Sequence, residues 1–157
     1  MGGKNLMEKN TKEMVLSLIA MIGTLFIITA VLVTFLYFNN VGNKPAEYFI
    51  QDGILRISGN YGEEIKLSDI VGITKEERIP EIQSRSNGYD SGNIRRGYFN
   101  LKDIGQTKLL IESQKEPPFI FINVKSGLRI LNMNEPTETE KLYEKLLEAW
   151  KQNTLLK

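Results

Sequence analysis

The chain opens with a long apolar run and then changes to short segments of alternating character. Residues 14–38 are 25 consecutive positions without a charged side chain. A helix needs about 20 apolar residues to cross a hydrocarbon core of about 30 Å, so this run predicts a membrane-spanning helix. Ser and Thr side chains fit such a helix, because their hydroxyls can donate to a carbonyl of the preceding turn. The polar members of the run are Ser17, Thr24, Thr29, Thr34 and Tyr37.

Two other interpretations of this run are a buried soluble helix and a cleaved signal peptide. A soluble helix that is apolar on every face would be unusual in a protein of 157 residues. A cleaved signal peptide has about 7–15 apolar residues followed by a small-residue cleavage site. Here the run is longer, and it ends in Phe35, Tyr37 and Phe38 before Asn39 and Asn40. We therefore predict an uncleaved anchor with a single span.

The basic residues that flank the run indicate its orientation. Lys4, Lys9 and Lys12 precede it, and only Lys44 follows closely. The positive-inside rule then predicts a cytoplasmic N-terminus and an extracytoplasmic domain at the cell membrane. The expected organisation is a short tail at residues 1–13, the helix at 14–38, a polar linker at 39–45 and one domain at 46–157.

The remaining sequence has the pattern of a small β domain. Asp52-Gly53 lies between two apolar segments and predicts a tight hairpin. Residues 119–124 are apolar on both faces, which is typical of a central strand. The expected strands are residues 48–50, 54–58, 64–67, 70–74, 98–102, 108–112, 119–124 and 128–131.

The last segment has the period of an amphipathic helix. Pro136 and the capping-box spacing that starts at Thr137 mark its beginning. Leu142, Leu146 and Trp150 form one apolar stripe, which could dock on a membrane or a partner but more often covers the protein's own core. The expected fold class is mainly β: a barrel or sandwich of seven or more antiparallel strands with a C-terminal capping helix.

Composition excludes several kinds of chemistry. The chain has no cysteine and no histidine, which excludes disulfides, cysteine nucleophiles and Ser-His-Asp triads. Adjacent carboxylates such as Glu63 and Glu64 point to opposite faces of a strand, and no calcium-loop pattern is present. The domain has 16 basic and 17 acidic residues, which gives no argument for nucleic acid. We expect no enzyme activity, no cofactor and no metal.

Residues 78–102 are locally basic and rich in glycine. Arg85, Arg95 and Arg96 could form an anion site for a phospholipid headgroup. The other interpretation is a solvated loop whose glycines shape a crossing between sheets. A nucleotide loop is rejected because Tyr98-Phe99 occupies the place of its Lys and Ser/Thr. The charged residues of the segment are Arg78, Glu81, Arg85, Asp90, Arg95, Arg96 and Lys102, and its glycines are Gly88, Gly92 and Gly97.

Several short motifs carry a resemblance to a known family. They are residues 48–53, Ser68-Asp69-Ile70, Asn87-Gly88-Tyr89, Gly92, residues 97–101, residues 105–109, Pro117-Pro118-Phe119-Ile120 and residues 134–146. With these motifs, residues 46–150 resemble the bacterial pleckstrin-homology-like domains of membrane-tethered proteins. The resemblance implies a barrel with a C-terminal helix. Because most members are functionally uncharacterised, it implies no catalytic residues.

These patterns predict a membrane-anchored, non-catalytic binding or scaffolding module. Its expected partner is an unidentified protein, recognised through a sheet edge or a loop. The alternative is recognition of anionic lipid headgroups through residues 78–102. An enzyme is the least supported class, since histidine, cysteine and a carboxylate constellation are all missing.

Overall fold

The computed structural model describes the backbone of residues 2–42 and 45–155, and the side chains of residues 10–37 and 45–155. The chain divides after Asn43 into a helical unit and a folded domain, which are considered separately.

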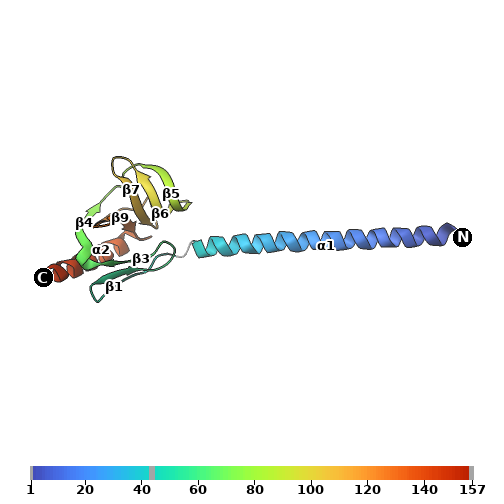
Figure 1. The fold of residues 1–157 in the computed structure, drawn as a ribbon, viewed down its shortest axis with the longest axis horizontal. Helices are drawn as coiled ribbons and strands as arrows, with labels where there is room; N and C mark the ends of the chain where they lie inside the picture. Colours follow the sequence, from blue (N-terminus) through green and yellow to red (C-terminus); the bar gives the residue numbers. More distant parts are fainter. Residues whose placement is uncertain (1, 43–44, 156–157) are drawn as a thin grey trace. The chain divides into compact units, whose positions relative to one another are not determined.

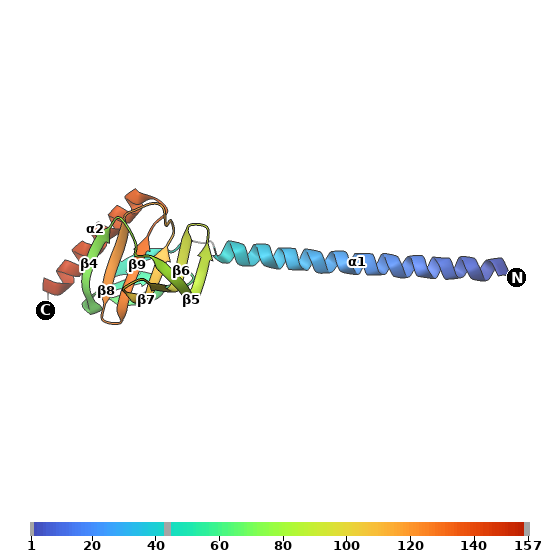
Figure 2. The ribbon, with the colours of Figure 1, turned by 90° about the horizontal axis from the view of Figure 1, so that it is seen from above.

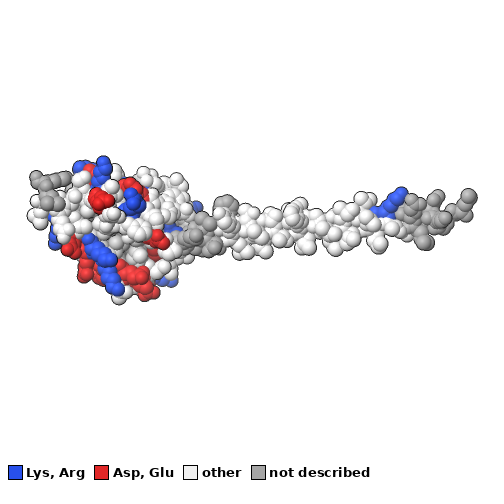
Figure 3. All heavy atoms as spheres, turned by 90° about the horizontal axis from the view of Figure 1, so that it is seen from below, with Lys and Arg blue, Asp and Glu red and all other residues white. Residues whose placement is uncertain are grey.

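The helical unit is one continuous helix, α1, from Gly2 to Gly42. Its segment Asn10–Tyr37 is long and apolar enough to cross a membrane, as the sequence predicted. At 1.5 Å per residue these 28 residues extend about 42 Å. The described side chains of this segment are exposed, and its surface is uncharged apart from one end (Figure 3).

Three threonine hydroxyl groups of α1 make the hydrogen bonds expected of a helix in lipid. Thr24 Oγ1 donates to the Ala20 carbonyl oxygen at 2.6 Å. Thr29 and Thr34 make the same bond four residues back, each at 2.8 Å. No hydroxyl of these three threonines therefore needs water or a neighbouring helix as a partner.

The ends of α1 lie beyond the expected span. The helix includes residues 2–13, which we expected as a tail, and residues 39–42, which we expected in the linker. Gly42 and Pro45 are the first strong helix breakers after the apolar run, so the helix can continue through Asn39 and Asn40. Residues 43 and 44 of the expected linker lie outside the described residues.

The described residues of the domain, 45–155, form nine strands in two sheets, a 3-10 turn and a C-terminal helix (Figures 1 and 2). The smaller sheet has the order β1-β2-β3, and the larger has the order β4-β8-β9-β7-β6-β5. The elements are β1 (Tyr48–Gln51), β2 (Ile54–Ile57), β3 (Glu63–Lys66), η1 (Leu67–Asp69), β4 (Ile70–Glu76), β5 (Ile82–Ser91), β6 (Ile94–Leu101), β7 (Gly105–Ile111), β8 (Phe119–Val124), β9 (Gly127–Asn132) and α2 (Pro136–Leu155).

The first hairpin forms where the sequence predicted it. Asp52 and Gly53 both have positive φ, 53° and 73°, which suits the two-residue turn whose twist matches a hairpin. Gln51 pairs with Ile54 across this turn. The turn therefore fixes which residues of β1 face the core.

The larger sheet confirms the central strand and corrects its expected antiparallel order. β8 lies inside the sheet, between β4 and β9. However, β9 pairs with β7 in parallel, so the expectation of an entirely antiparallel fold is wrong at this pair. β9 follows β8 after a tight turn and therefore runs antiparallel to it. It lies between β8 and β7, and in this position it runs in the same direction as β7.

Residues 82–101 form a long hairpin, so the interpretation of this segment as a solvated loop is wrong, whereas the strand expected at 98–102 corresponds to the end of β6. β5 and β6 pair antiparallel, and Gly88 lies opposite Gly97. A Cβ atom at Gly88 would lie 2.4 Å from the Arg96 carbonyl oxygen, and one at Gly97 would lie 2.4 Å from that of Asn87. These glycines allow two strands to approach closely, so the local glycine content reflects pairing.

Two apolar clusters form the core of the domain. The first contains Leu55, Leu110 and Leu131, and it includes the stripe of α2 with Leu142 and Leu146. The second contains residues of β6, β7, β8 and β9, such as Phe99, Leu109, Phe119 and Ile130. The expectation that α2 covers the protein's own core is confirmed.

Candidate binding groove

A groove of about 720 Å³ lies between strand β1 and helix α2. It is lined by one strand of the smaller sheet and by successive turns of the helix, which together make an apolar floor with polar and charged borders. Its residues are Tyr48, Phe49, Ile50, Gln51, Met133, Glu138, Lys141, Leu142, Lys145, Glu148, Ala149 and Gln152.

Strand β1 is an open edge of its sheet. Among the described residues β2 is its only strand neighbour. The Ser58 amide donates to the Glu47 carbonyl oxygen at 2.9 Å, and in an antiparallel pair such hydrogen-bonded positions alternate with non-bonded ones. With Tyr48 opposite Ile57 and Ile50 opposite Leu55, the backbone N–H and C=O groups of Tyr48 and Ile50 point away from β2. These groups are directed to the free edge.

The side chains of β1 divide between the two faces of the sheet. Tyr48 and Ile50 pack against the first core cluster. Phe49 and Gln51 lie on the other face, and Phe49 is 51 % exposed. An exposed aromatic side chain beside an open strand edge is a typical anchor for a partner.

Helix α2 is firmly docked as the second wall of the groove. Leu146 is fully buried, and Trp150 Nε1 donates to the Ile70 carbonyl oxygen at 3.1 Å. On another side of the helix, Lys75 Nζ lies 2.6 Å from Glu140 Oε2. The hydrogen bond to Glu140 raises the pKa of Lys75. Core packing, the indole bond and this ion pair together hold the wall in place.

The start of the domain is hydrogen-bonded to a buried ion pair. Arg96 and Glu112 have side chains only 1 % and 2 % exposed. Arg96 Nε donates to Glu112 Oε1 at 2.9 Å, and Arg96 Nη2 donates to Glu112 Oε2. The Ala46 amide donates to the same Glu112 Oε1 at 3.2 Å. This contact positions the chain two residues before β1.

The hydroxyl of Tyr48 lies in the same buried region. It is completely buried and has no hydrogen-bond partner among the described residues. Burial, with a smaller contribution from the charge of Glu112, raises the pKa of the Tyr48 phenol. β1 is therefore fixed by both its backbone and the inward side chain of Tyr48.

Asn132 holds the backbone that carries Glu112. Its Oδ1 accepts the amides of Glu112 and Ser113 at 3.0 and 3.3 Å. Its Nδ2 donates to the carbonyl oxygens of Ser113 and Glu116 at 2.6 and 3.0 Å. This fully buried side-chain amide provides hydrogen-bond partners for backbone N–H and C=O groups of the turn, which would otherwise be unpaired in the interior.

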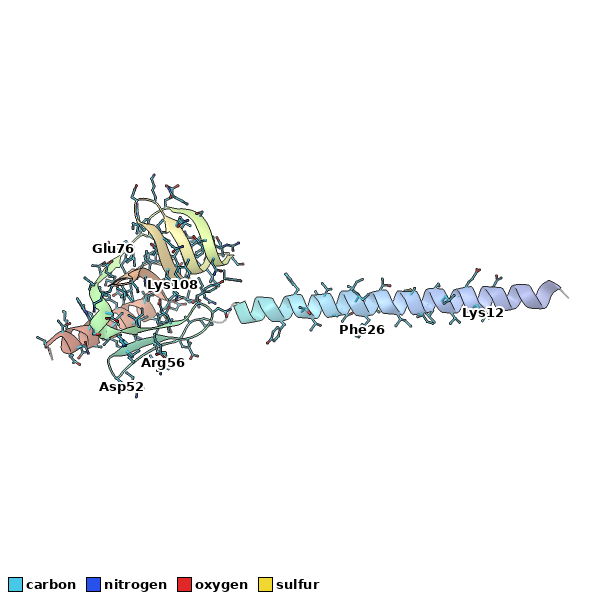
Figure 4. All side chains as sticks on the ribbon, in the orientation of Figure 1. Lys12, Phe26, Asp52, Arg56, Glu76 and Lys108 are labelled. Atoms are coloured by element: carbon cyan, nitrogen blue, oxygen red, sulfur yellow. The ribbon has the colours of Figure 1, made fainter. Side chains whose placement is uncertain are left out.

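A second charged cluster joins the two sheets. Lys108 of β7 and Arg129 of β9 each contact Glu63, which begins β3, at 3.2 Å. Lys108 lies between the sheets in Figure 4. Glu64, the next residue, instead pairs with Arg56 at 2.7 Å on the exposed side. The prediction that Glu63 and Glu64 point to opposite faces is confirmed.

The structure does not gather the three predicted site arginines into one site. Arg85 is exposed on β5. Arg95 Nη1 contacts Asp90 Oδ1 at 2.9 Å and the Gly92 carbonyl oxygen at 2.8 Å. Arg96 is buried with Glu112, so the expectation of three solvated guanidinium groups is wrong for Arg96. Arg95 and Arg96 point to opposite faces because they are consecutive strand residues.

Neither the groove nor the buried ion pair was predicted from the sequence. Strand alternation could have shown that Arg96 shares a face with Tyr98 and not with Arg95. The groove has no local signal, because its two walls come from residues 48–51 and 133–152. Within the described residues no group of three or more carboxylates could hold a metal ion.

Comparisons with protein families, curated proteins and solved structures identified no match to this chain. The resemblance to bacterial pleckstrin-homology-like domains therefore stays a prediction.

Proposed function

We propose that this protein is a membrane-anchored, non-catalytic interaction module of the pleckstrin-homology-like type. Its anchor is α1, and its partner is a protein that places an extended segment in the groove between β1 and α2. The domain faces the outside of the cell membrane, as the distribution of lysines around the helix predicts.

The observation that carries the proposal is the open edge of β1 inside a groove. Backbone groups of Tyr48 and Ile50 are directed to that edge, and an apolar floor lies beside them. Addition of a strand to an exposed edge next to a helix is a recurrent mode of peptide recognition, in which the backbone supplies affinity and side-chain pockets supply specificity.

Lipid recognition by residues 78–102 is less well supported. Of the three arginines expected to act together, one is buried in an ion pair and one is bonded within its own hairpin. Charges of both signs are also mixed over the face of the domain in Figure 3. Such a surface gives little long-range attraction to an anionic membrane.

Site-specific photocrosslinking in the native membrane tests the proposal. A photoreactive phenylalanine analogue replaces Phe49 in one variant and Ile104 in another, since these side chains are 51 % and 46 % exposed and only Phe49 lines the groove. We expect one defined protein adduct from position 49 and none from position 104. Equal adducts from both positions, or none from position 49, would refute the proposed site.

A further inference from the structure

The helical wall of the groove carries an ordered row of charges. Glu138, Lys141, Lys145 and Glu148 all line the groove, so the row reads negative, positive, positive, negative along α2. Lys141 and Lys145 are one turn apart, where like charges repel. Neither lysine makes an ion pair with any residue that the structure describes.

We propose that the segment bound in this groove is an extended peptide with acidic side chains facing Lys141 and Lys145. This inference rests on the proposed function and names the chemistry of its partner. A peptide carboxylate beside the two lysines would relieve the repulsion between them. Lys141 and Lys145 are separated by about 6 Å of helical rise, and side chains two residues apart on one face of a strand are separated by about 6.7 Å. Acidic residues at alternate positions of the peptide can therefore each meet one lysine.

Charge also argues against two occupants from this chain. If β1 of a second copy added to β1, its inward side chains would be Tyr48 and Ile50, which bring no carboxylate to the lysines. The last described residues of the C-terminal helix, 152–155, contain no acidic side chain either. A separate, acidic segment is the occupant that complements the groove.

Synthetic peptides with a symmetrical pattern provide the probe. Each has the sequence Thr-Ile-Thr-X-Thr-X-Thr-Ile-Thr, in which X is Glu, Gln or Lys, so that either strand direction presents the same side chains. Binding to the full-length protein in neutral detergent micelles is measured by fluorescence anisotropy of a dye on the peptide. We expect the Glu peptide to bind about five- to tenfold more tightly than the Gln peptide, with the Lys peptide weakest. This preference should decrease as salt is added.

Charge reversal in the protein tests which residues determine the order of the peptide affinities. The Lys141→Glu/Lys145→Glu variant should prefer the Lys peptide to the Glu peptide. The matched control is Lys66→Glu/Lys115→Glu, which makes the same change in net charge at exposed positions outside the groove. The control should keep the wild-type order. Equal affinity of wild-type protein for the Glu and Gln peptides would overturn the acidic preference.

Backbone methylation separates failure of this inference from failure of the proposed function. Two further versions of each of the three peptides carry N-methyl groups on either the odd or the even residues, because only one of these sets points its N–H groups to β1. If the peptide adds to β1 as a strand, methylation of one set of residues abolishes binding for the Glu, Gln and Lys peptides alike. Methylation of the other set leaves binding intact. If this result holds without a charge preference, the acidic preference is wrong and the groove function stands. If no peptide of any charge binds, both proposals are wrong.

Discussion

Removing one partner of the buried ion pair between Arg96 and Glu112 should strongly destabilise the domain. Replacing Arg96 by Met keeps much of the side-chain volume but leaves the Glu112 carboxylate, 2 % exposed, with the Ala46 amide as its one remaining hydrogen-bond donor among the described residues. Removing one partner of a buried pair typically costs about 3–5 kcal/mol, because the other charge stays in the interior. A small domain has a free energy of unfolding of about 5–15 kcal/mol in total. The Arg96→Met variant should therefore be close to unfolding at 37 °C.

Urea unfolding of the full-length protein in micelles measures this loss. Trp150 is the only tryptophan and lies in the domain, so its fluorescence reports the domain without interference from α1. The matched control is Arg56→Met, which breaks an exposed Arg–Glu pair with side chains 56 % and 57 % exposed. The control should lose no more than about 1 kcal/mol.

A double variant tests whether the uncompensated charge is the cause of the loss. Arg96→Met/Glu112→Gln removes the charge and keeps an acceptor for the Ala46 amide, so it should recover at least half of the loss. The reasoning is refuted if Arg96→Met and Arg56→Met lose the same free energy. It is also refuted if the double variant is less stable than Arg96→Met.

Three more predictions follow from the groove walls and the anchor. Burial raises the pKa of Tyr48 above its ordinary value of 10.0, so the unfolded chain loses the phenolic proton at a lower pH than the folded chain. The stability contributed by neutral Tyr48 is therefore complete below pH 10 and declines above it. The melting temperature of Tyr48→Phe should therefore fall less than that of the wild type between about pH 9 and about pH 11. Trp150→Ala should lose about 3–5 kcal/mol of stability by circular dichroism, and Trp150→Phe clearly less; a loss below about 1 kcal/mol for Trp150→Ala would mean that the indole does not secure α2. Protease added outside intact cells should digest the domain and spare α1, whereas full protection would reverse the proposed orientation.

The elements with regular periodicity were predictable from the sequence alone. The apolar run, the Asp52-Gly53 hairpin, the central strand 119–124 and the final helix all follow local rules of spacing and turn chemistry. Each of them has enough apolar side chains in a regular order to specify its own local structure. The broader expectation, a mainly β domain with a covering helix, followed from their number and order.

β5 was not predictable in the same way because it is an exposed edge strand. Residues 82–91 are largely polar, and its register shifts twice against β6, so it has no regular alternation. Its pairing depends on β6 and on the close approach of Gly88 to Gly97. The groove was not predictable because it depends on where α2 docks relative to β1.

The parallel pair of β7 and β9 determines when the larger sheet can be completed during synthesis. Within the described part of the chain, β9 is the only link in that sheet between the pair β4-β8 and the group β7-β6-β5. The ribosome makes β9 last of the nine strands, so β7 and β8 each have an unpaired edge until Asn132 has emerged. Residues 10–37, in contrast, are complete before any strand exists and can enter a bilayer first. If α1 enters the membrane first, as proposed, the domain folds with its chain already tethered, and the late insertion of β9 makes this step depend on contacts distant in sequence.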